Sequence, residues 1–270
     1  MTTLICWVAV DSRGPAAAYI ASDSRISWNA GTGWNHGQKV FTARTTPDMF
    51  GFCGDVVFAT SVLSQAVSMI DSGLLYDRHA DRDFRLDSIE QLFAVGLDAY
   101  PNDLRRPFSV LYCYRTTENT TPAGLNIGQV DWSPRSGWTR QWLEVPSASK
   151  LVVALGSGGD AAKEWDERWA RSDVGGTSRA VFSGFCDHLA SGEDPRTGGA
   201  PQVAGFYRKG PAFTLGFVGE GGLTYLGLPV SRTDLARAVG WRDCLFQLCD
   251  PLTGRPAVGA QLHARPVQLL

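Results

Sequence analysis

The order of the expected elements predicts an α+β fold, a four-layer αββα sandwich of two mainly antiparallel sheets. Along the chain, strands are followed by two helices, further strands, two more helices and a last group of strands. A parallel doubly wound sheet would need strict alternation of strand and helix, which this order lacks. The first two strands, Leu4–Val10 and Ala16–Ser22, are apolar on both sides, as in strands covered on two faces. Two sheets packed face to face, with helix pairs outside, would bury such strands.

Two helices are expected in the first half of the chain. Apolar residues recur every three or four positions in Val56–Ser72, which is typical of an amphipathic helix. The second helix is expected at Ser88–Tyr100. Ser88 and Gln91 are spaced as in a capping box, and Pro101 follows as a stop.

The second half of the chain also has two expected helices, and a C-terminal tail follows its last strands. Helices are expected at Asp160–Arg171 and Thr177–Ala190. We divide the chain into a domain of residues 1–230 and a C-terminal extension of residues 231–270. The extension has a short helix around Asp234–Leu248, and it could cover an edge, dock on a partner or hang loosely. Further strands are expected around Phe41 and at Met49–Cys53, Phe108–Tyr114, Leu125–Val130, Thr139–Val145, Leu151–Leu155, Gln202–Tyr207, Ala212–Val218 and Gly222–Leu228.

Composition excludes several classes of function. The chain has 270 residues, a net charge of -2 and a pI near 6.1, so nothing suggests a nucleic-acid or anionic-membrane partner. No apolar run approaches the roughly 18 residues that span a bilayer. The six cysteines match neither a disulfide framework nor a zinc site, and no signal peptide precedes the first strand. A cytoplasmic protein without metal or cofactor is therefore expected. The four histidines are expected on the surface or in the core rather than in catalysis.

The second residue of the chain could carry chemistry. Once Met1 is removed, Thr2 has its hydroxyl next to a free α-amine. The reference pKa of such an amine is about 7.7–8.0, so part of it is unprotonated at neutral pH and can take the hydroxyl proton. This pairing is the N-terminal threonine form of nucleophilic catalysis.

Five short segments carry further polar residues and glycines near the ends of expected strands. Two common motifs, a dinucleotide-binding fingerprint and a serine-esterase elbow, are rejected for them. Gly156-x-Gly158-x-x-Ala161 has the spacing of a dinucleotide fingerprint but lies outside a βαβ unit. No Gly-x-Ser-x-Gly elbow of a serine esterase is present. The five segments are Ala21–Arg25, Gln38–Phe41, Gly51–Asp55, Gly156–Asp160 and Asp194–Gly199.

Thr2 and the five segments that follow it resemble the motifs of the proteasome-type N-terminal-nucleophile (Ntn) hydrolases. The motifs occur in the same order, over about residues 2–230. That family comprises the proteasome β subunits and their bacterial relatives. Thr197 stands where the family has serine, which keeps the hydroxyl. The resemblance implies the Ntn-hydrolase fold and a threonine-nucleophile amidohydrolase, with a peptide as the expected substrate.

The resemblance also implies roles for single residues. Lys39 would tune the nucleophile electrostatically, and Asp23 would hold Lys39. Gly54 would donate its N–H to the oxyanion, and Ser157 would bind the amine. Asp194, together with Thr197, would support Ser157. From the residues alone, a surface lysine, turn or capping carboxylates and helix caps remain open.

Two points concern the substrate and the oxyanion site. By resemblance, Ile26, Phe52 and Val56 would line an apolar specificity pocket, although they could equally be core. The family often has a second glycine after the oxyanion glycine, and this chain has Asp55 instead. That carboxylate would oppose catalysis if it points inward, whereas it would favour a helix dipole if it points outward.

Alternatives of other classes stay open. The chain could be a non-catalytic subunit that serves as a ring or scaffold component, because fold does not fix function. A small-molecule amidase would use the same acyl chemistry as a peptidase. By resemblance we expect a homo-oligomer, with a ring as one form. The number of subunits and any unfoldase or activator remain open.

Overall fold

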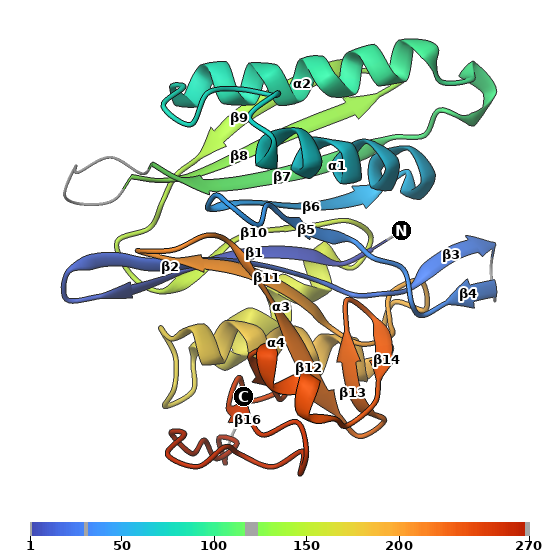
Figure 1. Cartoon of the computed structure of the whole chain (residues 1–270). Helices are drawn as coiled ribbons and strands as arrows, with labels where there is room; N and C mark the ends of the chain where they lie inside the picture. The colour runs from blue at the N-terminus through green and yellow to red at the C-terminus, as the bar shows by residue number, and fades with distance from the viewer. Residues whose placement is uncertain (1, 30–31, 117–123, 268–270) are drawn as a thin grey trace.

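The computed structural model describes residues 2–29, 32–116 and 124–267. In this part of the chain, four layers follow one another: two helices, a five-stranded sheet, a larger sheet and two further helices (Figure 1). The predicted α+β four-layer sandwich is confirmed.

Helix α1 (Val56–Asp71) and helix α2 (Arg82–Ala99) cover the outer face of the five-stranded sheet. Helix α3 (Gly159–Ala170) and helix α4 (Ser178–Ser191) cover the other sheet. All four lie close to the sequence expectation, apart from the start of α2.

The larger sheet of the described residues is antiparallel except for one added strand, β15, which runs parallel to β12. β1 lies between β10 and β2, so the N-terminal strand has neighbours on both sides. In spatial order the strands are β10 (Lys150–Leu155), β1 (Leu4–Asp11), β2 (Gly14–Ser22), β11 (Gln202–Tyr207), β12 (Phe213–Gly219), β13 (Gly222–Tyr225) and β14 (Leu228–Val230), with β15 (Trp241–Arg242) and β16 (Leu248–Cys249) beside β12.

The five-stranded sheet is antiparallel throughout. A hairpin that the sequence pattern did not predict, β3 (Ile26–Asn29) with β4 (Thr32–Trp34), projects from the edge of the sandwich (Figure 1). Two 3-10 turns, at Asn102–Leu104 and Asp234–Ala238, complete the described structure. The strands of the five-stranded sheet are β5 (Val40–Thr42), β6 (Asp48–Gly54), β7 (Phe108–Arg115), β8 (Leu125–Ser133) and β9 (Gly137–Leu143).

Side-chain alternation along β1 divides the core in two. Leu4 and Cys6 point into the space between the sheets, whereas Ile5 and Trp7 point toward α3 and α4. The sheets approach each other closely at Gly51, where an added Cβ would lie 2.6 Å from an Ile20 methyl. Both faces of β1 are therefore buried, as its apolar sequence predicts.

Helix α2 begins six residues before the position expected from sequence. Asp81 caps the helix by accepting a hydrogen bond from the Phe84 amide at 2.8 Å. The predicted capping box at Ser88 is wrong, because the Ser88 hydroxyl donates to the Phe84 carbonyl within the helix. The first turn escaped the pattern because its buried position is occupied by Arg85, whose guanidinium donates to Asp48.

The C-terminal extension packs on the larger sheet. The helix expected around Asp234–Leu248 is wrong, since only Asp234–Ala238 forms a 3-10 turn and β15 follows. The Phe246 ring lies 5.0 Å from the ring of Phe182 and 5.5 Å from that of Tyr19, measured between centroids. The extension thus adds an aromatic side chain to the core between sheet and helices.

We predict that Phe246→Ala lowers the free energy of unfolding by about 1–3 kcal/mol, because it removes an aromatic ring from a core cluster. Urea denaturation measures this change. Leu235→Ala, at a side chain that is 86% exposed in the same extension, is the control and should change stability by less than about 0.5 kcal/mol. Equal effects of the two variants would contradict this packing.

Candidate functional site

A cleft of about 340 Å³ opens beside the N-terminal strand. It brings together Thr2, Gly54 and Ser157, which lie far apart in the sequence. Strand ends β6, β7 and β8 form one wall, and the turn between β10 and α3 forms another. The lining residues are Thr2, Cys53, Gly54, Pro107, Phe108, Ser109, Asp131, Trp132, Ser133, Ser136, Gly156 and Ser157.

Thr2 and Thr3 point to opposite sides of the chain. The Thr2 side chain lines the cleft, and its hydroxyl is buried without a hydrogen-bond partner among the described residues. An unpaired buried hydroxyl is costly, so such a group calls for an explanation. The Thr3 hydroxyl instead lies 3.0 Å from the Thr197 hydroxyl and 2.9 Å from His188 Nε2. Of the two threonines, only Thr2 is a lining residue of the cleft, and only its hydroxyl has no partner in the described structure.

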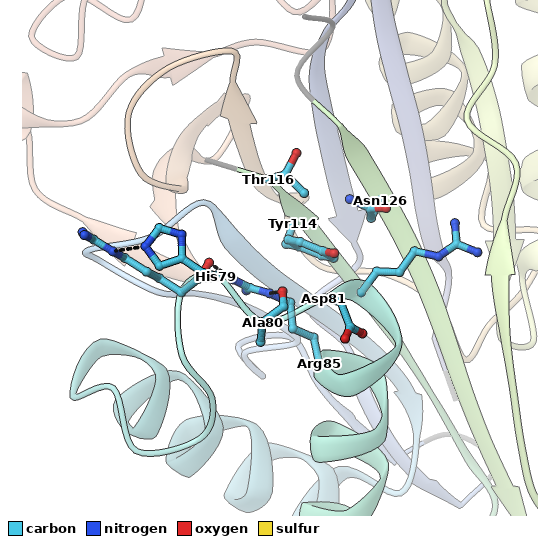
Figure 2. Close-up of a pocket in the computed structure, with 9 residues that line it drawn as sticks. His79, Ala80, Asp81, Arg85, Tyr114, Thr116 and Asn126 are labelled. Carbon is cyan, nitrogen blue, oxygen red and sulfur yellow. Dashed lines mark hydrogen bonds between the residues drawn. The ribbon is translucent and has the colours of Figure 1, made fainter. Parts of the chain in front are cut away.

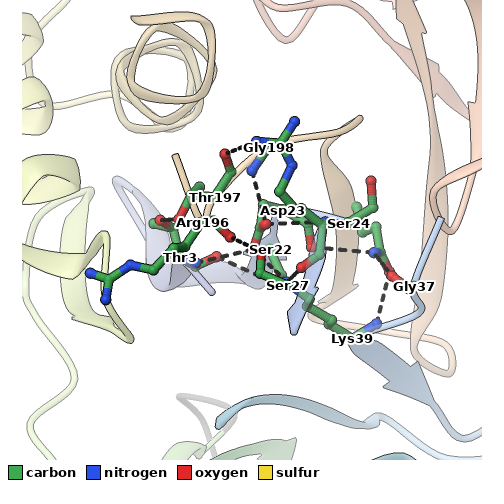
Figure 3. A network of polar contacts seen from close by, with 12 residues as sticks. Thr3, Ser22, Asp23, Ser24, Ser27, Gly37, Lys39, Arg196, Thr197 and Gly198 are labelled. Carbon is green, nitrogen blue, oxygen red and sulfur yellow. Dashed lines mark hydrogen bonds and ion pairs between the residues drawn. The ribbon is translucent and has the colours of Figure 1, made fainter. Parts of the chain in front are cut away.

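Asp23 and Lys39 form a fully buried ion pair (Figure 3). Lys39 Nζ lies 2.8 Å from Asp23 Oδ1, which also accepts the Thr3 amide at 3.0 Å. Asp23 Oδ2 accepts the amides of Arg25 and Gly198, each at 3.1 Å. The predicted pairing of these two residues is therefore present, and their carboxylate is bonded to the backbone next to Thr2.

The surroundings of Lys39 oppose its charge in part. Burial lowers the pKa of Lys39 below its ordinary value, although the nearby Asp23 carboxylate acts in the opposite direction. Lys39 Nζ also donates to the Arg25 carbonyl at 2.5 Å. Within the described residues it makes no hydrogen bond to the Thr2 hydroxyl, which has no partner.

Gly54 ends β6 with a positive φ of 106°. A Cβ at this position would lie 2.2 Å from the Pro107 carbonyl oxygen, so only glycine fits. The next residue, Asp55, caps α1 by accepting a hydrogen bond from the Phe58 amide at 3.0 Å. The departure from the family pattern thus has a structural role, because this carboxylate is turned to the helix N-terminus.

Ser157, Asp194 and Thr197 form one hydrogen-bonded group. Asp194 Oδ2 accepts the Ser157 hydroxyl at 2.7 Å and the Thr197 hydroxyl at 3.1 Å. Burial alone would raise the pKa of Asp194, but hydrogen bonds from Ser157, Arg196 and Thr197 outweigh it and lower the pKa to about 2. Asp194 is therefore ionised at neutral pH and holds Ser157 at the cleft.

The loop that carries Asp194 is fastened by Arg25. The Arg25 guanidinium donates to the Pro195 carbonyl at 2.9 Å and to the Thr197 carbonyl at 3.3 Å. Its Nε donates to Asn35 Oδ1 at 2.8 Å. These partners are carbonyl oxygens rather than carboxylates, so Arg25 has a structural role through hydrogen bonds to the loop.

The three residues expected in a specificity pocket lie elsewhere in the structure. Phe52 is fully buried and packs on Phe41, with ring centroids 6.4 Å apart. Val56 packs on the same core cluster at the start of α1. Ile26 is buried against Gly37. None of the three belongs to the described lining of the cleft, so their role in substrate binding stays a prediction.

Sequence reasoning missed two buried residues near this site. His188 comes from α4 and meets the Thr3 hydroxyl. Gln202 begins β11, accepts the Lys39 amide at 3.0 Å and donates to the Gly37 carbonyl at 2.6 Å. A histidine within an otherwise apolar helix face was the only available signal for His188, and nothing in the sequence pointed to Gln202.

Cys53 is the cysteine among the lining residues of the cleft. Burial raises the pKa of its thiol to about 11. The thiol is therefore protonated at neutral pH and a poor nucleophile. Thr2 is consequently the stronger candidate for covalent chemistry here.

A second cavity, also of about 340 Å³, lies at the N-terminal end of α2 (Figure 2). Its central cation, Arg85, donates to Asp48, to the Ala80 carbonyl and to the Arg78 carbonyl, so it holds the fold together. This cavity shares no lining residue with the cleft beside Thr2. The Thr2 cleft is therefore the candidate active site.

Two features are absent from the described ranges. No helix there combines the length and the apolar character needed to cross a membrane. Over the same residues, no group of three or more His, Cys, Asp or Glu side chains could hold a metal ion.

Comparison with solved structures identifies the fold. The chain is similar to Anbu, an ancestral beta-subunit from Yersinia bercovieri, with a TM-score of 0.50 and 11% identity over 78% of this chain and 82% of that one. This chain has the proteasome-type Ntn-hydrolase fold. No protein-family model and no curated protein sequence matches the chain.

Two further structures are similar over comparable lengths. BPH from Thiobacillus denitrificans, in complex with epoxomicin, has 17% identity and a TM-score of 0.48 over 77% of this chain and all of that one. HslV from Trypanosoma brucei has 14% identity and a TM-score of 0.46 over 76% of this chain and 99% of that one. The fold that the sequence motifs implied is thus confirmed by the similarity to Anbu.

We predict that Gly156→Ala disturbs the N-terminal strand. Gly156 has φ of 86°, and an added Cβ would lie 2.0 Å from the Thr2 carbonyl oxygen. Gly176→Ala is the matched control, since Gly176 has φ of 72° but open space around it. Gly176→Ala should cost about 1 kcal/mol of stability through backbone strain, and Gly156→Ala should cost more. Equal losses in urea denaturation would contradict the close approach of Gly156 to Thr2.

We also predict that Lys39→Met lowers the free energy of unfolding by about 3–5 kcal/mol, because it leaves the buried Asp23 charge without its partner. Lys163→Met is the control: Lys163 pairs with Asp160 at 2.9 Å, but both side chains are at least half exposed. That substitution should cost less than about 1 kcal/mol. A Lys39→Met variant as stable as the control would show that the buried pair does not support the fold.

Proposed function

We propose that the chain is an N-terminal threonine hydrolase that cleaves a peptide or another amide. The observation that carries this proposal is the cleft shared by Thr2, Gly54 and Ser157, in which the Thr2 hydroxyl is buried and unpartnered. The proposal requires that Thr2 be the first residue of the mature chain.

The reaction follows from the groups at the cleft. Thr2 Oγ1 attacks the amide carbonyl carbon, and the Thr2 α-amine takes the hydroxyl proton, directly or through a water. The carbonyl oxygen becomes an oxyanion, and we assign the Gly54 N–H as its hydrogen-bond donor. Collapse breaks the C–N bond, and the protonated α-amine gives its proton to the departing amine. Water then hydrolyses the ester on Thr2 and releases the acid.

The hydrogen bonding of the Ser157 hydroxyl favours this assignment. The Ser157 hydroxyl has one proton and donates it to Asp194. Its oxygen can therefore only accept further hydrogen bonds, which suits an α-amine with N–H groups to donate. The buried Lys39–Asp23 pair supplies a fixed field next to the Thr3 backbone. We assign the tuning of the nucleophile to Lys39 and the orientation of Lys39 to Asp23.

Substrate and assembly are assigned by class. The cleft combines aromatic walls, Phe108 and Trp132, with hydroxyls and the Asp131 carboxylate, so it can receive a side chain together with its polar backbone. The similar Anbu structure is named a beta-subunit, which supports a homo-oligomer for this chain. Size-exclusion chromatography with light scattering measures that assembly.

We predict that a threonine-directed electrophile, such as an epoxyketone, labels Thr2 covalently. The matched pair of variants is Thr2→Ala, which removes the nucleophile, and Thr2→Ser, which retains a hydroxyl. Intact mass spectrometry should find the adduct on the natural chain and on Thr2→Ser, and none on Thr2→Ala. Peptide hydrolysis should fall below detection only in Thr2→Ala, with folding unchanged by circular dichroism.

The same mass spectrum reports the N-terminus. A mature chain that starts at Thr2 and carries the adduct supports the hydrolase. A chain that keeps Met1, or that exposes Thr2 and still fails to label, favours the non-catalytic ring or scaffold subunit instead. Labelling that persists in Thr2→Ala would place the nucleophile elsewhere.

A further inference from the structure

His188 lies at the buried end of a chain of hydroxyl groups. Its Nε2 is 2.9 Å from the Thr3 hydroxyl, which is 3.0 Å from the Thr197 hydroxyl. Thr197 donates to Asp194 Oδ2 at 3.1 Å, and that oxygen also holds Ser157. A continuous path of hydrogen bonds therefore leads from α4 to the residue proposed to bind the Thr2 amine.

Counting protons fixes the direction of this path. Each threonine hydroxyl has one proton to donate. Thr197 gives its proton to the ionised Asp194, so Thr197 must accept from Thr3. Thr3 has then used its own proton and must accept from His188 Nε2. The path runs in one direction, and His188 Nε2 carries a hydrogen.

The surroundings of His188 favour a neutral ring. Its Nδ1 is buried without a partner in the described structure, so a proton added there would find no acceptor. Burial lowers the pKa of His188, while the charges of Glu193, Asp194 and Asp23 act in the opposite direction. Both the geometry and the direction of the pKa shift therefore indicate a neutral, Nε2-protonated imidazole at neutral pH.

Nothing can be inserted between these groups. A Cβ on Gly158 would lie 2.0 Å from the Thr3 hydroxyl oxygen and 2.8 Å from His188 Nε2. The backbone of the turn that carries Ser157 thus closes over the path. Because Thr3 follows Thr2 directly, fixing its hydroxyl also fixes the backbone on which Thr2 stands.

We propose that His188 is a positioning residue of the Thr2 site: through the hydroxyls of Thr3 and Thr197 it fixes both the Thr2 backbone and the Asp194–Ser157 pair. This role rests on the proposed function, since it concerns the same nucleophile. His188 does not touch the reacting atoms. It sets the one direction of hydrogen bonding in which Thr3 donates to Thr197 and Thr197 donates to Asp194.

The first experiment is independent of activity. Nitrogen-15 NMR of histidine-labelled protein at pH 7.5 distinguishes the two neutral tautomers, with the His188 signals assigned from their loss in His188→Gln. We expect a protonated Nε2 and an unprotonated Nδ1. A ring protonated only at Nδ1 would reverse the direction of the path and overturn the proposal.

The second experiment measures the site. His188→Leu removes the donor, whereas His188→Gln keeps an amide N–H near the position of Nε2. His188→Leu should slow both Thr2 labelling and peptide turnover by about tenfold, the effect of one lost hydrogen bond, through kcat rather than KM. His188→Gln should recover most of the rate. Equal rates in all three chains, or a loss in KM alone, would overturn the positioning role.

Two controls separate this role from folding and from the proposed function. His263→Gln changes a histidine of the C-terminal extension that bonds the Leu245 carbonyl, and it should leave the rate unchanged. Thr3→Val should slow the reaction as His188→Leu does, and the double variant should lose no more than either single one. An unreactive natural chain would overturn the positioning role along with the proposed function. The His188 tautomer would still test the direction of the hydrogen-bond path, independently of activity.

Acid stability gives a further readout. Since the pKa of His188 is lower in the folded chain, the unfolded chain binds more protons below about pH 6.5, and stability falls on acidification through that range. In His188→Gln this part of the loss should vanish. His263→Gln should retain it. A natural chain and a His188→Gln variant with the same pH slope would contradict a buried neutral imidazole.

Discussion

The site depends on the buried pair of Asp23 and Lys39. A charge removed from water is costly, and an isolated one would not be tolerated here. The Asp23 carboxylate meets this cost with four donors: the Lys39 ammonium and the amides of Thr3, Arg25 and Gly198. Those donors belong to the N-terminal strand, to two loops and to the approach to β5. One carboxylate thereby joins the segments that surround Thr2, and the same contacts explain why Lys39 is held without reaching the Thr2 hydroxyl.

Close backbone contact is the second constraint. At Gly54 the end of β6 meets the Pro107 carbonyl, and at Gly156 the turn after β10 meets the Thr2 carbonyl. At Gly158 the same turn closes over the Thr3 hydroxyl. A side chain at Gly156 or Gly158 would collide with Thr2 or Thr3, and one at Gly54 would collide with the Pro107 carbonyl. The glycines therefore act by letting backbones approach, and the cleft is the space that remains beside them.

The two threonines divide the work because a strand alternates its side chains. Thr2 faces the cleft and leaves its hydroxyl free, while Thr3 faces α4 and uses its hydroxyl to bind Thr197 and His188. The unpartnered hydroxyl and the anchored hydroxyl are thus on consecutive residues. Asp194 links the two sides, since one of its oxygens accepts from both Ser157 and Thr197. The anchored Thr3 side chain and the unpartnered Thr2 hydroxyl follow from the same alternation.

The sequence by itself determined the four-layer fold and the segments that meet at the site, because period, turn residues and motif order are local properties of the chain. The Asp23–Lys39 pair and the Ser157–Asp194 bond were implied by the resemblance of those motifs, and the structure contains both. Tertiary structure alone decided what those segments touch. Local pattern could not start α2 at a buried Arg85, turn Asp55 to its helix or remove Phe52 from the cleft. Nor could it bring His188 to Thr3, 185 residues away in sequence, since such contacts depend on how whole layers pack.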